Sequence, residues 1–224
     1  MEVYVKSRTG YPKVRGDCPF SHRVLLTITL KKIPHQVKLI DLKNKPAWFV
    51  DAFPKAEVPV VHFPEGRKEG PEWVSGSDTI CDVLEKEYPE PSLRLAQGKE
   101  AEVGSKIFGS FVKFVTNADP GKEAELKDAL LAEIKSLDAY LRENEGDYLG
   151  GARVCSVDVA LYPKVKHVCV AAEHYKELQL RKTFSAMDAW MKAFEESVET
   201  EDTYYPDEFI VEGWGPKVGL PVKL

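Results

Sequence analysis

The chain has 224 residues, of which 43% are hydrophobic and 30% are charged, values typical of a soluble globular protein rather than a disordered or fibrous one. Its formal net charge of -5 argues against a general nucleic-acid binder, because affinity for phosphate backbones depends on clustered Lys and Arg. No apolar run reaches the length of about 18 residues that suggests a transmembrane helix, so we expect no membrane partner.

The N-terminus and the cysteines indicate the compartment. The start, MEVYVKSRTG, lacks the apolar core of a secretory signal and the Arg- and Ser-rich character of a transit peptide. We therefore expect a cytoplasmic protein, unless an organelle presequence was removed. The cysteines are widely spread and form no CxxC pair, which predicts reduced thiols and no metal site. They are Cys18, Cys81, Cys155 and Cys169.

The first ninety residues alternate between strand-like and helix-like segments. We predict strands at 2–7 and 35–42, on either side of a helix over 19–32 whose apolar residues recur at intervals of three and four. This βαβ unit implies a parallel pair of strands. The remaining elements, a short helix, two hairpin strands and a helix, are predicted at 47–53, 58–63, 72–76 and 77–88. The resulting order, βαβαββα, is thioredoxin-like.

From Leu95 onward nearly every periodic segment is helical. The segment 122–146 carries a stripe of apolar residues at helical spacing, which predicts one buried face. The stripe consists of Leu126, Leu130, Ile134, Leu137 and Leu141. Further helices are predicted at 106–115, 155–175 and 183–199. We therefore predict two domains, 1–88 and 99–224, joined by a linker at 89–98.

Cys18 lies at the predicted start of a helix. Pro19 suits the first helical position, where its missing N–H leaves no hydrogen bond unmade. Cys18 is then the N-cap, where free backbone N–H groups and the helix dipole favour an anion, so we expect the thiol to ionise readily. Asp17 opposes this, because adjacent negative charges repel. The pattern predicts a nucleophilic sulfur; the alternative is a small N-cap residue without chemistry.

Ser21 occupies the place of the second cysteine in a dithiol reductase. Without a second cysteine no intramolecular disulfide can form there, so an oxidised Cys18 would be resolved by an external thiol. The sequence therefore predicts a monothiol mechanism if Cys18 is reactive.

Eight segments resemble the plant-type dehydroascorbate reductases of the glutathione transferase superfamily. They are GDCPFSHRVLLTITLKK, DLKNKPAWF, VPVV, SGSDTI, EKEYPEPSL, VGSKIFGSF, CSVDVALYPK and GWGPKV. The resemblance covers nearly the whole chain. It implies an α+β two-domain glutathione transferase fold, with an N-terminal thioredoxin-like domain and an all-helical C-terminal domain.

The resemblance also implies where glutathione binds. Val58 and a cis Pro59 would clamp the peptide backbone of glutathione, and Ser77 at a helix start would hold its γ-glutamyl carboxylate. Ser77 equally suits an ordinary N-cap. The implied glutathione-binding residues are Pro19, Phe20, Lys45, Val58, Pro59 and Ser77. The sequence departs from the family at Gly76, where an acidic residue is usual, and at Glu57, where lysine is usual.

For the second substrate, dehydroascorbate, the resemblance implies a set of polar residues that match its carbonyl and hydroxyl oxygens. The set is Lys6, Asp17, Lys45, His167 and Lys217. The lysines also suit ordinary solvated positions, because isolated lysines mostly lie at the surface. His167 equally suits a packed position inside a helix.

These residues predict glutathione-dependent reduction of dehydroascorbate to ascorbate, with Cys18 as nucleophile, Asp17 beside it, glutathione as co-substrate and no permanently bound cofactor. Alternatives are an omega-like glutathione thioltransferase and a protein similar to the chloride intracellular channels, which share a CPFS start. The segment after Cys18 is interrupted by Lys31, Lys32 and Pro34, which disfavours membrane insertion. The family resemblance implies a monomer.

Overall fold

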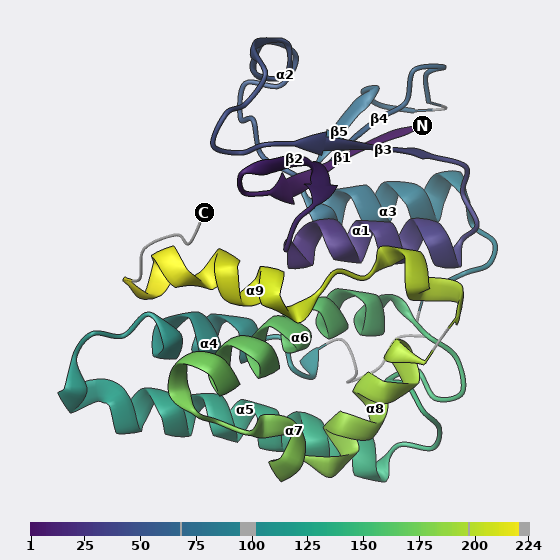
Figure 1. Cartoon of the computed structure of the whole chain (residues 1–224). Helices are drawn as coiled ribbons and strands as arrows, with labels where there is room; N and C mark the ends of the chain where they lie inside the picture. Colours follow the sequence, from purple (N-terminus) through teal and green to yellow (C-terminus); the bar gives the residue numbers. More distant parts are fainter. Residues whose placement is uncertain (68, 95–101, 197, 220–224) are drawn as a thin grey trace. The chain divides into compact units, whose positions relative to one another are not determined.

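A computed structural model describes residues 1–67, 69–94, 102–196 and 198–219 (Figure 1). The chain divides into two compact units. The first contains Met1–Leu93 together with Glu199–Phe209, and the second contains Arg94–Val198 and Ile210–Lys223. The predicted domain bounds remain predictions, and residues 95–98 of the predicted linker lie outside the described residues.

The first unit is a five-stranded sheet with helices on both faces (Figure 1). Its elements are β1 (Glu2–Arg8), β2 (Tyr11–Arg15), α1 (Pro19–Leu30), β3 (Gln36–Ile40), α2 (Ala47–Ala52), β4 (Val60–His62), β5 (Trp73–Ser75) and α3 (Ser77–Glu87). The predicted parallel pairing is confirmed, because β1 pairs with β3 in parallel from Glu2 opposite Gln36. On its other side, β1 pairs antiparallel with β4, and β4 pairs antiparallel with β5.

Alternate side chains of β1 point to opposite faces of the sheet, as the strand period of two requires. Val3 and Val5 pack into a buried cluster with apolar residues of α1 and α3. Tyr4, between them, packs into a second cluster that contains Phe49 of α2. Because both faces of β1 are covered, the end of this strand is a rigid base for the residues that follow it.

Strand β2 is absent from the sequence prediction. It forms an antiparallel hairpin with β1 through a turn at Gly10, which has a φ of 80°. Four of its five residues are exposed, so it lacks the alternating apolar pattern by which strands are recognised. The unpredicted hairpin leads directly to α1.

The second unit is helical. Its elements are α4 (Ile107–Val115), η2 (Pro120–Lys122), α5 (Glu123–Glu143), α6 (Ser156–Lys176), α7 (Leu180–Thr183), α8 (Ser185–Glu195) and η4 (Gly215–Val218). Helix α9 (Asp207–Trp214) crosses from the first unit into the second, and η3 (Val198–Thr203) lies at the preceding boundary. Of the predicted stripe on α5, Leu130, Ile134 and Leu137 are buried, whereas Leu126 and Leu141 at its ends are half-buried.

Two buried carboxylates fix the ends of helices in this unit. Asp138 of α5 accepts from the N–H groups of Ala186 and Met187 in the first turn of α8, at 2.8 and 3.0 Å. Asp158 of α6 is fully buried and accepts from the N–H of Cys155 at 2.9 Å, closing the first turn of α6. Such bonds satisfy helix N–H groups that have no partner within the helix.

Candidate active site at the start of helix α1

Cys18 is the N-cap of α1, as predicted, with extended backbone angles (φ -142°, ψ 110°) and Pro19 in the first helical turn. The Ser21 N–H donates to Cys18 Sγ at 3.4 Å, and the His22 N–H donates to the Cys18 carbonyl at 2.9 Å. The sulfur therefore lies where the free N–H groups of a helix start point, an environment that stabilises negative charge. Cys18 is half-buried, so it is neither enclosed in the core nor fully exposed.

The other cysteines lie in different environments, although all four are free thiols. Burial raises the pKa of Cys81, and it raises the pKa of Cys155 and of Cys169 to about 12. These three sulfurs are therefore protonated and inert near neutral pH. Cys18 is the remaining candidate for a reactive thiol.

Gly16 places the Cys18 turn against the end of β1. Its N–H donates to the Lys6 carbonyl at 2.8 Å. A Cβ at this position would lie 2.5 Å from the Ser7 carbonyl oxygen, so only glycine allows the two backbones to approach this closely. Sequence reasoning missed this role, because the partner of Gly16 is on a neighbouring strand.

Lys6 and Asp17 form an ion pair next to Cys18. Lys6 Nζ lies 2.5 Å from Asp17 Oδ1 and also donates to the Asp17 carbonyl at 3.3 Å. The two side chains are 20% and 9% exposed, so their charges are only partly screened by water. The structure thus brings together two residues implied for dehydroascorbate, with a cation that offsets the Asp17 charge beside the sulfur.

The Val58–Pro59 peptide bond is cis, as predicted. The Pro59 carbonyl accepts from the Gly76 N–H at 3.4 Å, which connects this turn to the start of α3. Within the described part of the chain, neither the N–H nor the C=O of Val58 forms a hydrogen bond. A backbone donor and acceptor therefore remain available for an extended peptide ligand.

Ser77 is the first residue of α3 and is buried, while the N-cap is Gly76 with a φ of 82°. Helix α3 begins at Ser77, as predicted, but the alternative role of Ser77 as the N-cap is taken by Gly76, whose positive φ suits glycine. Asp78, in the first turn, forms an ion pair with Arg23 of α1. This pair, which sequence reasoning missed, connects the first turn of α3 to α1.

The other implied residues fall into two groups. Phe20 is 40% exposed on the first turn of α1, and Lys45 is exposed in the loop before α2. His167 and Lys217 belong to the second unit, where both contact Trp214. The buried His167 accepts from Trp214 Nε1 at 3.1 Å, and Lys217 Nζ lies 4.1 Å from the Trp214 ring centroid.

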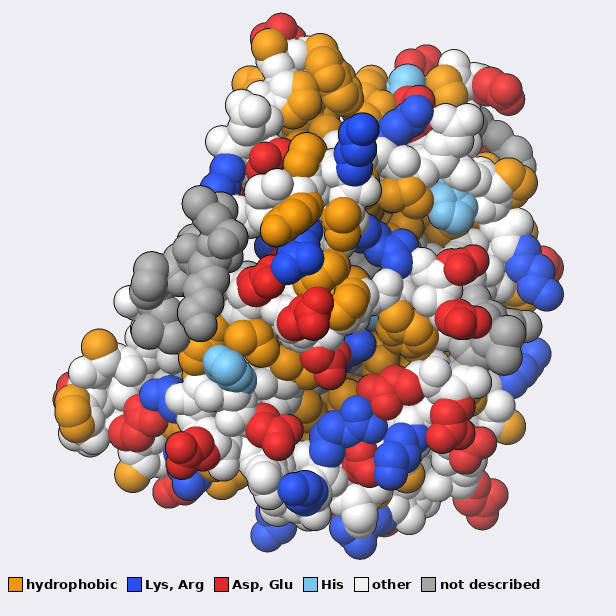
Figure 2. Space-filling model, in the orientation of Figure 1, with side chains coloured by type: hydrophobic (Ala, Val, Ile, Leu, Met, Phe, Trp, Pro, Cys, Tyr) orange, Lys and Arg blue, Asp and Glu red, His pale blue; other side chains and the backbone are white. Residues whose placement is uncertain are grey.

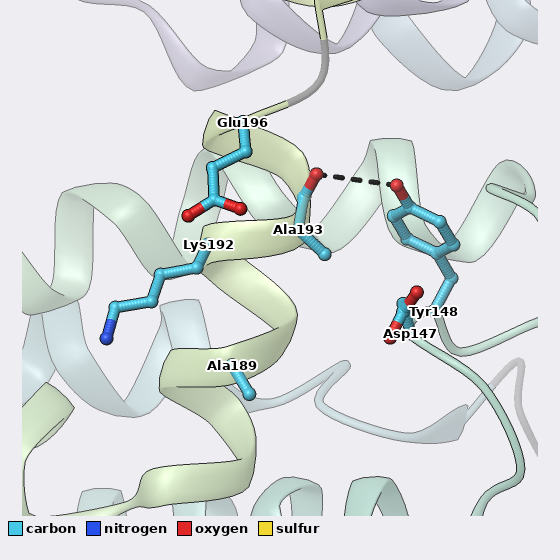
Figure 3. A pocket seen from close by; sticks show the side chains of 6 residues that line it. All are labelled: Asp147, Tyr148, Ala189, Lys192, Ala193 and Glu196. Carbon is cyan, nitrogen blue, oxygen red and sulfur yellow. Dashed lines mark hydrogen bonds between the residues drawn. The ribbon is translucent and has the colours of Figure 1, made fainter.

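A groove of about 540 Å³ lies elsewhere, on α8 of the second unit (Figure 3). Its lining residues are Asp147, Tyr148, Ala189, Lys192, Ala193 and Glu196. Figure 3 shows the Tyr148 hydroxyl donating to the Ala193 carbonyl, at 3.4 Å. None of the implied site residues lines this groove, so we assign it no part in the candidate site.

The face drawn in Figure 2 shows no single-sign charge patch that indicates a further site. On the face drawn in Figure 2, acidic and basic side chains are interspersed. Among the described residues, no group of three or more His, Cys, Asp and Glu is arranged to hold a metal ion. Within the same residues, no helix is both long and apolar enough to cross a membrane.

Comparison with known proteins agrees with this geometry. Residues 17–87 match the family "Glutathione S-transferase, N-terminal domain". The chain is 39% identical over 218 residues to "Glutathione S-transferase DHAR2" of Arabidopsis thaliana, covering 97% of this chain and 98% of the relative. It is 38% identical to "Probable glutathione S-transferase DHAR1, cytosolic" of Oryza sativa subsp. japonica, with the same coverage.

A solved structure shows the same fold along nearly the whole chain. The crystal structure of Chlamydomonas reinhardtii dehydroascorbate reductase matches with a TM-score of 0.82 and 34% identity. The match covers 96% of this chain and 97% of that one. The predicted fold class, a thioredoxin-like domain followed by a helical one, is confirmed.

Proposed function

This chain belongs to the dehydroascorbate reductase family of the glutathione transferase superfamily, and we propose that it reduces dehydroascorbate to ascorbate with glutathione through Cys18. The observation that carries the proposal is the half-buried free thiol of Cys18 at the N-terminus of α1, with the Ser21 N–H on its sulfur. The other three thiols have raised pKa values.

The proposed chemistry has three steps. The Cys18 thiolate adds to a carbonyl carbon of dehydroascorbate, forming a C–S bond while the carbonyl oxygen takes a proton. A glutathione thiolate then attacks the Cys18 sulfur: the S–S bond forms, the C–S bond breaks, and its electron pair leaves with the organic fragment as ascorbate. A second glutathione thiolate attacks the mixed disulfide, releasing oxidised glutathione and the Cys18 thiolate. Two glutathione molecules thus supply the two electrons.

The surrounding residues support these steps. The free N–H and C=O of Val58 pair with the backbone of glutathione beside the cis Pro59, and Ser77 with the first turn of α3 holds its γ-glutamyl carboxylate. The Lys6–Asp17 pair offers a cation and a carboxylate to the polar oxygens of dehydroascorbate. Lys45, Pro19 and Phe20 complete the site, and His167 and Lys217 remain predictions that rest on the family resemblance.

Replacement of Cys18 tests the proposal. We measure the appearance of ascorbate absorbance from dehydroascorbate, with and without glutathione, for Cys18→Ser and for the matched control Cys81→Ser, whose thiol is also half-buried but has a raised pKa. Cys18→Ser is expected to abolish glutathione-dependent turnover, because a hydroxyl cannot form the mixed disulfide, whereas Cys81→Ser retains it. Most of the activity surviving in Cys18→Ser would refute the mechanism.

An omega-like thioltransferase would use the same cysteine. "Glutathione S-transferase omega-1" of Sus scrofa is 30% identical but over only 65% of this chain, against 97% for the Arabidopsis thaliana relative. The Lys6–Asp17 pair beside the sulfur favours an oxygen-rich substrate over a general disulfide. Assaying the protein on a small glutathione mixed disulfide and on dehydroascorbate at equal concentrations ranks the two. Cytoplasmic location and the monomeric state remain predictions.

A further inference from the structure

Residues Glu199–Phe209, here called the return segment, come from near the C-terminus but group with the first unit (Figure 1). Arg15, at the end of β2, donates from Nη2 to the carbonyls of Asp202 and Tyr204, both at 2.6 Å. Arg8 of β1 lies over the Phe209 ring, 4.2 Å from its centroid. The return segment is therefore held against the hairpin that leads into the Cys18 turn.

The return segment is also attached to His22, which follows Cys18 in the sequence. His22 Nε2 is 3.1 Å from Thr203 Oγ1, and both side chains are buried. The Thr203 hydroxyl donates its single hydrogen to the Thr200 carbonyl at 2.7 Å, so it accepts from His22, whose Nε2 carries the proton. His22 is also the residue whose N–H closes the first turn of α1 on the Cys18 carbonyl.

Tyr205 makes a further contact between the return segment and α1. Its ring is 6% exposed and makes an edge contact with the His22 ring, with centroids 5.3 Å apart. Burial raises the Tyr205 pKa well above its ordinary value, and the nearby Cys18 and Asp17 raise it further. Arg15 acts in the opposite direction, and Asp207 adds a small effect of the same sign as Cys18. The phenol is therefore neutral near neutral pH.

We propose that the return segment is a positioning element for Cys18: Arg15, three residues before it, and His22, four residues after it, are both anchored to this segment, which fixes the turn between them. The inference rests on the proposed function, in which Cys18 reacts. Arg15 and His22 act through the turn and not on substrate, so both are positioning residues. A displacement of reacting atoms by about 1 Å can lower a rate by roughly 100-fold, so such anchoring has a measurable effect.

The test uses the full chain with Arg15→Leu, which removes both bonds to the return segment. Lys13→Leu is the matched control, because Lys13 is an exposed cation on the same strand. Thr203→Val removes the His22 bond without changing charge, and it decides the question if Arg15→Leu fails to fold. Arg15→Lys keeps the charge and a single donor nitrogen on a shorter side chain, so it is expected to restore part of the loss.

Three quantities are measured well below each melting temperature: amide exchange of residues 199–209, alkylation of Cys18 by iodoacetamide followed by peptide mass spectrometry, and kcat with dehydroascorbate. Arg15→Leu and Thr203→Val are expected to raise exchange and to lower both rates by about tenfold, while Lys13→Leu stays within about twofold of wild type. Faster exchange with unchanged alkylation, or unchanged exchange in both variants, would overturn the proposal.

The alkylation assay contains neither glutathione nor dehydroascorbate. If the wild-type protein alkylates at Cys18 but reduces no dehydroascorbate, the proposed function fails, whereas the effect of the return segment on the thiol is still measured. The two failures are thus distinguishable.

Discussion

Gly16→Ala is expected to damage the candidate site more than the fold. The added Cβ would lie 2.5 Å from the Ser7 carbonyl oxygen and 2.9 Å from the Arg8 nitrogen, against an ordinary contact distance of 3.4 Å or more. Both are backbone atoms of β1, whose two faces are packed, so the Gly16 segment must move by close to 1 Å. Such overpacking costs about 1–3 kcal/mol of unfolding free energy.

Because Cys18 is two residues away, the same movement displaces its sulfur from the Ser21 N–H. We expect kcat to fall by about 100-fold, and Cys18 alkylation at neutral pH to fall as well. The control is Gly109→Ala in α4, where an added Cβ has no neighbour within 4 Å and alanine favours the helix. If kcat and Cys18 alkylation of Gly16→Ala both stay within about twofold of wild type, the sulfur has not been displaced and the reasoning is refuted.

Three further changes test stability. Asp158→Ala leaves the N–H groups of Leu149 and Cys155 and the Trp190 indole without their acceptor, so urea denaturation should show a loss of at least about 3 kcal/mol. Cys155 is the N-cap of α6, and Cys155→Ser supplies a better hydrogen-bond acceptor there. The unfolding free energy should rise by up to about 1 kcal/mol and the melting temperature with it, so an unchanged or lower melting temperature contradicts this. Hydrogen bonds from His62 and Tyr4 lower the pKa of Glu2, so its ionised form stabilises the fold above its ordinary pKa, and this contribution is lost as pH falls through the lowered pKa. Glu2→Gln should therefore flatten the acid limb of unfolding free energy against pH, and an unchanged limb contradicts the assignment.

The predictable part of the fold is the part with strong periodicity. The stripe on α5 and the βαβ unit around α1 follow from spacing alone, because each buries a continuous apolar face. Strand β2 escapes prediction because its stability comes from pairing with β1, while its own side chains are mostly exposed. Helix α9 was not predicted either, since only part of its length is strongly apolar.

The candidate site divides in the same way. Cys18 before Pro19, and Val58 before Pro59, are visible as short motifs, and the structure bears out the N-cap position and the cis bond. Gly16 is missed because its constraint is set by Ser7, which lies across a strand pair. The start of α3 at Ser77 is predicted correctly, but the N-cap at Gly76 is missed, because a positive φ cannot be read from the sequence pattern.

What local sequence cannot supply is the surroundings of the reactive turn. Arg15 reaches the Tyr204 carbonyl across 189 residues of sequence, and His22 reaches Thr203 across 181. No periodicity or motif in the sequence indicates either contact, because each joins one side chain to a segment that contains no strand and no long helix. The N-cap cysteine explains why a thiol here can react, but the position of its turn depends on contacts with residues about 180 positions later in the sequence. An alteration near Thr203 should therefore be felt at Cys18 although the two are distant in sequence.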